Sequence, residues 1–383
     1  MKAVRKDLSD DRMIISYGDS HLSVNKYAYL VVSLIETGSS DSEIKDALLS
    51  EYGVDEDLDS IKIIRNRLHA LKQNGKKDKK YLFLNLRLFT FKDKNLFLGY
   101  LSLLYKKWIP YLVLSFCALV ILVNLDIFHF DYKILLNEIK VNPIVSVLYF
   151  VMSVLILIVH EFGHASAIYA YGLVPKEISF GIYMYFPVFY TDVSGAWGLE
   201  KKKRLMVDCG GFYFQIILAT LLILIYRLTG SGEVLIKVLL WDNILMILYN
   251  LNPLFHFDGY WLCSDFLDLP NLRPRSLTAV SDLIARLSSK SYRKKDRPFG
   301  VAYYLYGVVS ILFILTTCCI FWRIMIGVVI SDLHSKISPD LIGIIKFIFK
   351  YLLMVLIIIV SSWTIYSYLS NLIKNAIQLR KED

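Results

Sequence analysis

Residues 155–170 read LILIVHEFGHASAIYA and place His160, Glu161 and His164 inside one of the most apolar stretches of the chain. A polar group in lipid or in a protein core is costly unless something pairs with it. Residues four apart share one face of a helix, so both imidazoles can point at one ion, and Glu161 can reach a water molecule on that ion. This HExxH spacing predicts a zinc site in which two histidines are ligands and the glutamate moves the proton.

A third ligand has to come from another part of the chain. The stretch NLNPLFHFDGYW, residues 250–261, is the best candidate, because Pro253 breaks a helix and Gly259 permits a tight turn. His160 lies in the second predicted span, and this stretch follows the fourth. Both spans run in the same direction, so His160 and Asp258 can meet at similar depth. The side chains to be weighed as ligands are Asp258, His256, Asp192 and Cys263.

The composition is that of a membrane protein. The chain has 383 residues, 56% of them hydrophobic, which is too apolar for an ordinary soluble protein. Six runs approach the length that crosses a bilayer, and they cover residues 108–123, 145–169, 207–226, 234–250, 303–321 and 342–366. No signal peptide is recognised before them, and the polar first hundred residues predict a soluble amino-terminal domain.

Charge placement predicts the orientation in the membrane. The net charge is +9, and the basic residues gather in segments 199–206 and 271–298 and in the tail, whereas segment 124–142 leans acidic. Six spans with both termini in the cytoplasm place every basic segment inside. We therefore expect a multi-pass cell-membrane protein in contact with the lipid bilayer. Nucleic acid is not an expected partner, because the basic loops alternate with spans.

The amino-terminal residues predict a small winged-helix-like α+β domain over residues 1–80. MIISYGDSHLSV, residues 13–24, reads as a hairpin, and three helices follow within residues 24–38, 39–53 and 59–75. Ser40 and Glu43 form a capping box for the second helix, which ends near Gly53. Residues 81–107 are expected to be a linker and juxtamembrane segment, and residues 108–370 a mainly α transmembrane domain.

Two resemblances to known families rest on these motifs. HEFGH in a span, followed by NP....DG after a later span, resembles the site-2 protease family of intramembrane zinc metalloproteases. This resemblance implies that the Zn²⁺ ligands are His160, His164 and Asp258. It also implies that Glu161 is the base and that Asn252 holds the substrate backbone or orients the site. The head resembles the PqqD-like RiPP recognition element, whose members pair the leader peptide of a ribosomally made, modified peptide with a sheet edge.

The chain departs from the site-2 protease pattern in two places. The Gly-Pro found in many relatives at the start of the third span is Gly210-Gly211-Phe212 here, and no PDZ domain is recognised between the spans. The head therefore gains weight as the element that recognises the substrate. ISFGIYMYFPVFYTDV, residues 178–193, is rich in aromatic and β-branched residues, which favours either a hairpin with an edge for an extended substrate or a packed loop.

These observations predict an intramembrane zinc endopeptidase. Its expected partner is a membrane-associated peptide, and its expected role is maturation or leader removal of a ribosomally made modified peptide whose leader binds the head. One alternative is regulated intramembrane proteolysis of a membrane-anchored regulator. Another is a non-catalytic peptide exporter or immunity protein, against which the intact Glu161 argues.

Overall fold

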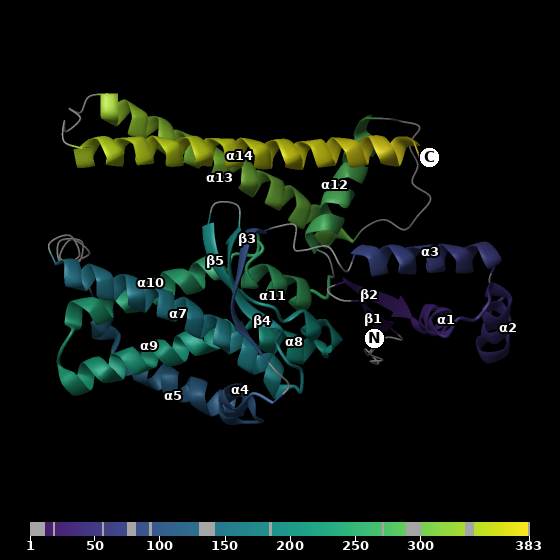
Figure 1. Ribbon diagram of the computed structural model, residues 1–383, viewed down its shortest axis with the longest axis horizontal. Coiled ribbons are helices and arrows are strands. Elements are labelled where there is room, and N and C mark those ends of the chain that lie inside the picture. The colour runs from purple at the N-terminus through teal and green to yellow at the C-terminus, as the bar shows by residue number, and fades with distance from the viewer. Residues whose placement is uncertain are drawn as a thin grey trace. The chain divides into compact units, whose positions relative to one another are not determined.

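The computed structural model describes residues 12–17, 20–55, 57–74, 82–91, 94–129, 142–183, 186–269, 272–288, 300–333 and 341–381. The chain divides into two compact units. The amino-terminal unit comprises Met1–Tyr183 and Pro187–Leu251, and the carboxy-terminal unit comprises Met184–Phe186 and Asn252–Asp383. Helices make up most of the described residues in both units (Figure 1).

The chain begins with a hairpin and three helices. Strands β1 (Arg12–Tyr17) and β2 (Ser20–Asn25) pair antiparallel, and α1 (Lys26–Glu36), α2 (Asp41–Tyr52) and α3 (Leu58–Asn74) follow. These elements confirm the predicted ones, whereas the hairpin turn at residues 18–19 and Gly75 lie outside the described residues. Their buried core contains Val31, Val32, Ile35, Ile44, Leu48, Ile61 and Leu68. A winged-helix arrangement of these elements remains a prediction.

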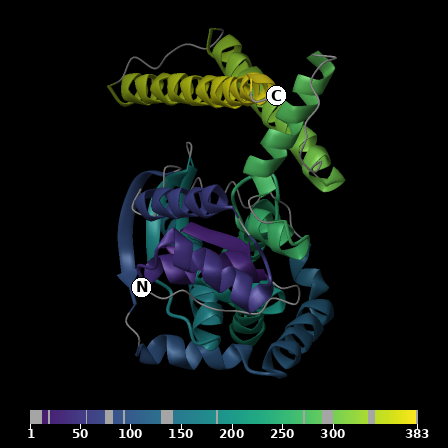
Figure 2. The same ribbon diagram turned by 90° about the vertical axis from the view of Figure 1, so that its right-hand side faces the viewer.

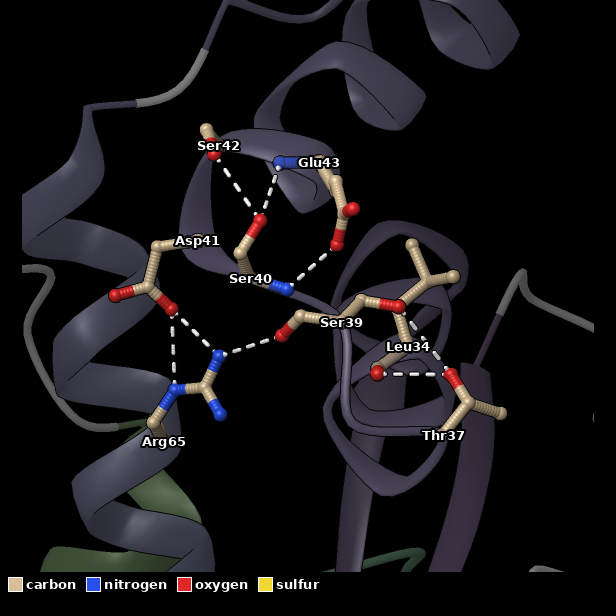
Figure 3. Close-up of polar contacts among 8 residues, drawn as sticks. All are labelled: Leu34, Thr37, Ser39, Ser40, Asp41, Ser42, Glu43 and Arg65. Atoms are coloured by element: carbon tan, nitrogen blue, oxygen red, sulfur yellow. Dashed lines mark hydrogen bonds and ion pairs between the residues drawn. The ribbon is translucent and has the colours of Figure 1, made fainter.

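The start of α2 is fixed by the capping box that the sequence predicts (Figure 3). The backbone N–H of Glu43 donates to the Ser40 hydroxyl over 3.3 Å, and the backbone N–H of Ser40 donates to the Glu43 carboxylate over 2.8 Å. Arg65 of α3 donates to the Asp41 carboxylate over 2.6 and 3.1 Å and to the carbonyl oxygen of Ser39 over 3.1 Å. This guanidinium therefore joins α3 to the first turn of α2.

A three-stranded sheet follows the head, with the order β3-β4-β5. It consists of β3 (Leu82–Thr90), β4 (Glu177–Tyr183) and β5 (Phe186–Thr191), and β3 pairs antiparallel with β4. The sequence left a hairpin and a packed loop open for residues 178–193, and strands β4 and β5 form the hairpin, whose residues 184–185 lie outside the described part of the chain. Residues 82–90, expected to be linker, form strand β3 beside the hairpin (Figure 2).

The remaining amino-terminal unit is a helical bundle around α7 (Pro143–Ala170), α9 (Gly210–Thr229) and α10 (Glu233–Asn250), which pack on one another (Figure 1). Helix α5 (Ile109–Val123) packs on α9, and α4 (Leu96–Ser102) packs on α7. Shorter elements are the 3₁₀ helices η1 (Leu103–Tyr105), η2 (Leu125–Phe128) and η3 (Ser194–Gly198) and the helix α8 (Lys201–Asp208). The apolar side chains at the centre of the bundle include Ile156, Ile223, Leu239 and Leu240.

The carboxy-terminal unit contains α11 (Asp258–Phe266), α12 (Leu272–Ser288), α13 (Val301–Leu333) and α14 (Leu341–Lys381). Helix α12 packs on both α13 and α14. Gly307 permits the close approach of α13 to α12, because a Cβ there would lie 2.7 Å from the carbonyl oxygen of Ser276. Trp322 of α13 donates its indole N–H to the hydroxyl of Ser361 on α14 over 2.9 Å.

The six predicted spans are not all confirmed. Four helices within the described residues are long and apolar enough to cross a membrane, namely α7, α9, residues 301–331 of α13 and residues 350–377 of α14. A fifth results if α4–η1 and α5, which meet at a bend of 75°, form one broken span. The predicted span at 234–250 is helix α10, but its 18 residues include Glu233, Lys237 and Asp242, which is too much charge for an apolar span.

Candidate metal centre

The HEFGH motif lies in the second half of α7. The helix starts at the Asn142 N-cap, whose side chain accepts from the N–H groups of Ile144 and Val145. His160, Glu161 and His164 are 2%, 7% and 5% exposed, so the motif is buried although the helix surface near its start is exposed. Burial of three polar groups on one helix requires partners for each of them.

The two histidines face each other. Their Nε2 atoms lie 3.1 Å apart, and their rings are 4.8 Å apart between centroids. The Nδ1–H of His160 donates to Oε1 of Gln215 on α9 over 2.9 Å. The Nδ1–H of His164 donates to the carbonyl oxygen of Val207 at the end of α8 over 2.7 Å. Both outer nitrogens are therefore held by acceptors, as in metal sites where a second contact fixes the ligand tautomer.

This pairing fits a metal ion. A neutral imidazole that carries its proton on Nδ1 has a lone pair on Nε2. Two such lone pairs converge on one point, which is the arrangement that two imidazole ligands of one cation require. Imidazole nitrogen is one of the ligand types that zinc prefers, so the two histidines suit this ion.

Glycine contacts bring α9 close to the motif. A Cβ at Gly163 would lie 2.2 Å from the carbonyl oxygen of Gly210, and one at Gly211 would lie 2.3 Å from Cε1 of His160. The hydroxyl of Tyr105 donates to the carbonyl oxygen of Gly163 over 2.9 Å. The Gly210-Gly211 pair, which departs from the Gly-Pro pattern, therefore leaves room for the His160 ring.

Glu161 is held from the end of strand β5. The hydroxyl of Thr191 lies 2.8 Å from Oε2 of Glu161 and 3.0 Å from its backbone carbonyl oxygen, and it can donate to either. The base predicted from the sequence thus has a fixed partner beside the two imidazoles.

Asp192 has contacts that keep its carboxylate in a turn. It is 7% exposed, accepts from the backbone N–H of Ser194 over 3.0 Å, and lies 3.7 Å from the ammonium group of Lys176. These contacts give Asp192, which the sequence offered as a candidate ligand, a structural role in the turn.

The candidate residues near 250–261 belong to the carboxy-terminal unit. Asp258 is the first residue of α11 and is half-buried. The Asn252 amide oxygen accepts from the backbone N–H of Leu254 over 2.9 Å, which shapes the turn before α11. The roles of Asp258 as third ligand and of Asn252 in substrate binding remain predictions.

His256 is an unsuitable zinc ligand. Arg273 of α12 donates to its Nδ1 over 2.7 Å, so the imidazole proton is on Nε2 and neither nitrogen offers a lone pair. Burial and the neighbouring Arg273 lower the pKa of His256 to about 3, which keeps the ring neutral. Arg273 also donates to the carbonyl oxygen of Leu254, and the hydroxyl of Tyr306 donates to that of Pro253 over 2.8 Å. The arginine therefore holds the loop that leads to α11.

The sequence interpretation missed the residues that hold the motif. Gln215, Thr191 and Tyr105 belong to no motif, and the sequence alone assigns them no role. Their one signal is polarity: Gln215 stands between apolar residues of α9 and is fully buried, so it needs a partner. Polarity alone does not identify that partner as His160.

Comparison with known proteins finds a similarity to a protein whose name describes a zinc metalloprotease. The chain is 30% identical over 128 residues to "Putative peptide zinc metalloprotease protein YydH" of Bacillus subtilis (strain 168). The matched segment covers 33% of this chain and 49% of YydH, so the chain spans about half the length of this relative. No family model and no solved structure matches the chain.

Proposed function

We propose that this protein is an intramembrane zinc endopeptidase, similar to the site-2 proteases, that hydrolyses a peptide bond in a membrane-associated peptide. The observation that carries the proposal is the imidazole pair, with Nε2 atoms 3.1 Å apart and both Nδ1 atoms held by acceptors, next to a buried glutamate in an apolar helix. The similarity to YydH, whose name describes a peptide zinc metalloprotease, supports a protease function.

His160 and His164 would hold the zinc ion, and Asp258 is the proposed third ligand. Two imidazoles and one carboxylate are donors that suit a metal ion, and the protonated Nε2 of His256 removes the nearest competitor. Asn252 is proposed to bind the substrate backbone through its side-chain amide, whose oxygen accepts from the backbone N–H of Leu254 in the turn.

When bound, zinc would polarise the scissile carbonyl and lower the pKa of a water molecule. The chain supplies the remaining parts. Glu161 takes a proton from the attacking water on a carboxylate oxygen and passes it to the leaving amine. Gln215 and the carbonyl of Val207 keep the protons of the two histidines on Nδ1. The substrate is cut in an extended conformation, because a helix hides its carbonyl groups in its own hydrogen bonds.

The proposed substrate is the precursor of a ribosomally made modified peptide, and the proposed event is its maturation or leader removal. The head supports this proposal in one respect: it has its own buried core and a short antiparallel hairpin. A leader strand would pair with the edge of such a hairpin. Both termini are proposed to face the cytoplasm, where the precursor is made.

Two other functions remain as alternatives. Regulated cleavage of a membrane-anchored regulator would use the same centre on a substrate with a single span. A non-catalytic exporter or immunity protein would need the metal but not the base, and Glu161 with its Thr191 contact weighs against it.

The test is zinc content and peptide cleavage of the full chain purified in detergent, with a precursor peptide encoded beside its gene as substrate. We expect about one zinc per chain. Glu161→Gln should keep zinc without cleavage, and Asp258→Ala should lose zinc. Retention of both zinc and activity in Asp258→Ala would remove Asp258 from the ligand set. Zinc binding without cleavage of any precursor would favour the non-catalytic alternative.

A further inference from the structure

Thr191 is the last residue of β5 and the contact between the sheet and the glutamate of the motif. Its hydroxyl lies 2.8 Å from Oε2 of Glu161 and 3.0 Å from the carbonyl oxygen of the same residue. One hydroxyl thus reaches both the side chain and the backbone of Glu161. A hydrogen bond to a carboxylate in a buried setting is stronger than one between neutral groups.

The backbone at Thr191 and at the residue that follows it is itself fixed by hydrogen bonds. The backbone N–H of Asp192 donates to the carbonyl oxygen of Glu177 over 2.9 Å, and that of Lys176 donates to the carbonyl oxygen of Asp192 over 3.1 Å. The N–H of Val193 donates to the carbonyl oxygen of Thr191 over 3.1 Å. Strand pairing with the β4 side and the turn that follows therefore hold the threonine in place.

The buried Asp192 carboxylate stabilises this turn. It accepts from the backbone N–H of Ser194, and Lys176 donates to the Ser194 hydroxyl over 2.8 Å while lying 3.7 Å from the carboxylate. A threonine on a free loop would follow the glutamate as it moved. A threonine that is held by a strand and a closed turn instead restricts the position of the glutamate carboxylate.

A glutamate that acts as a base needs such a guide. Its side chain has several rotatable bonds, and proton transfer requires a fixed position relative to the reacting water. On this basis, and resting on the proposed protease function, we propose that Thr191 is a positioning residue that holds the carboxylate of Glu161 in its working orientation. Strand β5 thereby sets the position of the base.

A purely structural threonine would behave differently. If its methyl group or strand packing mattered, Thr191→Val would preserve function and Thr191→Ser would impair it. If the hydroxyl matters, the order is reversed. Thr220 offers a control in the same unit, because it is buried and its hydroxyl donates over 2.9 Å to the carbonyl oxygen of Ile216 within α9, away from the motif.

The first experiment measures kcat, KM and zinc content of the full chain in detergent micelles. The probe is a pool of dye-labelled apolar peptides about 20 residues long, the length of a membrane span. We expect Thr191→Val to lower kcat about 10- to 100-fold with unchanged KM and zinc content, in line with a misplaced base. Thr191→Ser should keep kcat within a few-fold of the wild-type value. The control variant Thr220→Val should have the wild-type kcat. Wild-type kcat in Thr191→Val, or equal loss in the valine and serine variants, would overturn the proposal.

A second experiment needs no substrate. Thermal midpoints are measured for Thr191→Val, Glu161→Ala and the double variant. The shift caused by Thr191→Val should be smaller when Glu161 is already alanine, because only the contact of the hydroxyl with the backbone carbonyl oxygen then remains to be lost. Additive shifts would refute the contact and the proposal with it. If wild type cuts neither this pool nor the precursor peptide, the proposed function fails, and the thermal measurement still decides the Thr191–Glu161 contact.

Discussion

Substitution of Gly211 by alanine adds one methyl group beside the ring on which the metal centre depends. The new Cβ would lie 2.3 Å from Cε1, 2.4 Å from Nε2 and 2.6 Å from Nδ1 of His160. Ordinary van der Waals contact begins near 3.4 Å, so the ring would have to move by about 1 Å. Its Nδ1 is 2.9 Å from Oε1 of Gln215, and such a movement takes that bond outside normal hydrogen-bond length.

The magnitudes indicate which property to measure. Forcing a methyl group into a packed site costs about 1–3 kcal/mol, while alanine in a helix gains up to about 1 kcal/mol over glycine. The net change in the free energy of unfolding is then small. Loss of an outer hydrogen bond of a ligand histidine lowers metal affinity about 10- to 100-fold. Zinc affinity is therefore the sensitive readout, and stability is not.

The assay is competition between the purified protein and a chelator of known zinc affinity, followed by metal analysis. Gly211→Ala should release zinc at about 10- to 100-fold lower chelator concentration than wild type. Gly327→Ala is the control, because this glycine of α13 has nothing within 4 Å of an added Cβ. Wild-type zinc affinity in Gly211→Ala, with Gly327→Ala also unchanged, would refute the reasoning that the position of the His160 ring sets metal binding.

Three further predictions concern the contacts around the centre and the head. Gln215→Met should lower zinc affinity about 10- to 100-fold, whereas Gln215→Glu, which keeps an acceptor, should retain it in the same chelator assay; equal losses would exclude the hydrogen bond as the cause. Arg273→Ala should increase amide hydrogen exchange in residues 252–258, because Arg273 holds the loop before α11. The control Arg275→Ala loses a contact with the Tyr303 hydroxyl and should leave this exchange unchanged. Unchanged exchange in Arg273→Ala would show that Arg273 does not hold the loop. Arg65→Ala should destabilise α2 by about 1–2 kcal/mol, seen as about 5- to 30-fold faster exchange there, and unchanged exchange would show that the Asp41 contact contributes nothing.

Local patterns in the sequence predicted the elements whose causes are local. The capping box of Ser40 and Glu43 depends on residues three apart, and it forms as expected. The aromatic and β-branched content of residues 178–193 favoured either a hairpin or a packed loop, and the β4–β5 hairpin is one of these two alternatives. The i,i+4 spacing of His160 and His164 was enough to place both rings on one face of a helix.

The number of membrane spans was harder to predict, because a mainly apolar segment can still contain charged side chains. Helix α10 has the expected position, but Glu233, Lys237 and Asp242 together carry too much charge for an apolar span. Asp242 accepts from the Ser153 hydroxyl of α7 over 2.7 Å, so a charge that looks misplaced in one helix serves as a bridge between two. Pairing across helices cannot be read from the hydropathy of one segment.

The contacts that define the centre come from distant parts of the sequence. Gln215 is 55 residues from His160, Val207 is 43 residues from His164, and Thr191 is 30 residues from Glu161. No periodicity links such pairs. A polar residue in an apolar span indicates that a partner is needed, but the identity of that partner depends on how the helices cross.

The crossing itself is set by glycines. Gly163 of α7 and Gly210 of α9 leave no room for a side chain between their backbones, which brings α9 close to the motif. At that separation both outer nitrogens of the histidine pair find acceptors, and the lone pairs of the inner nitrogens converge. The HExxH spacing supplies two rings on one face, whereas the acceptors of Gln215 and Val207 fix their tautomer. A chain with the same motif and a larger residue at either glycine would keep the histidines but not the arrangement that makes them ligands.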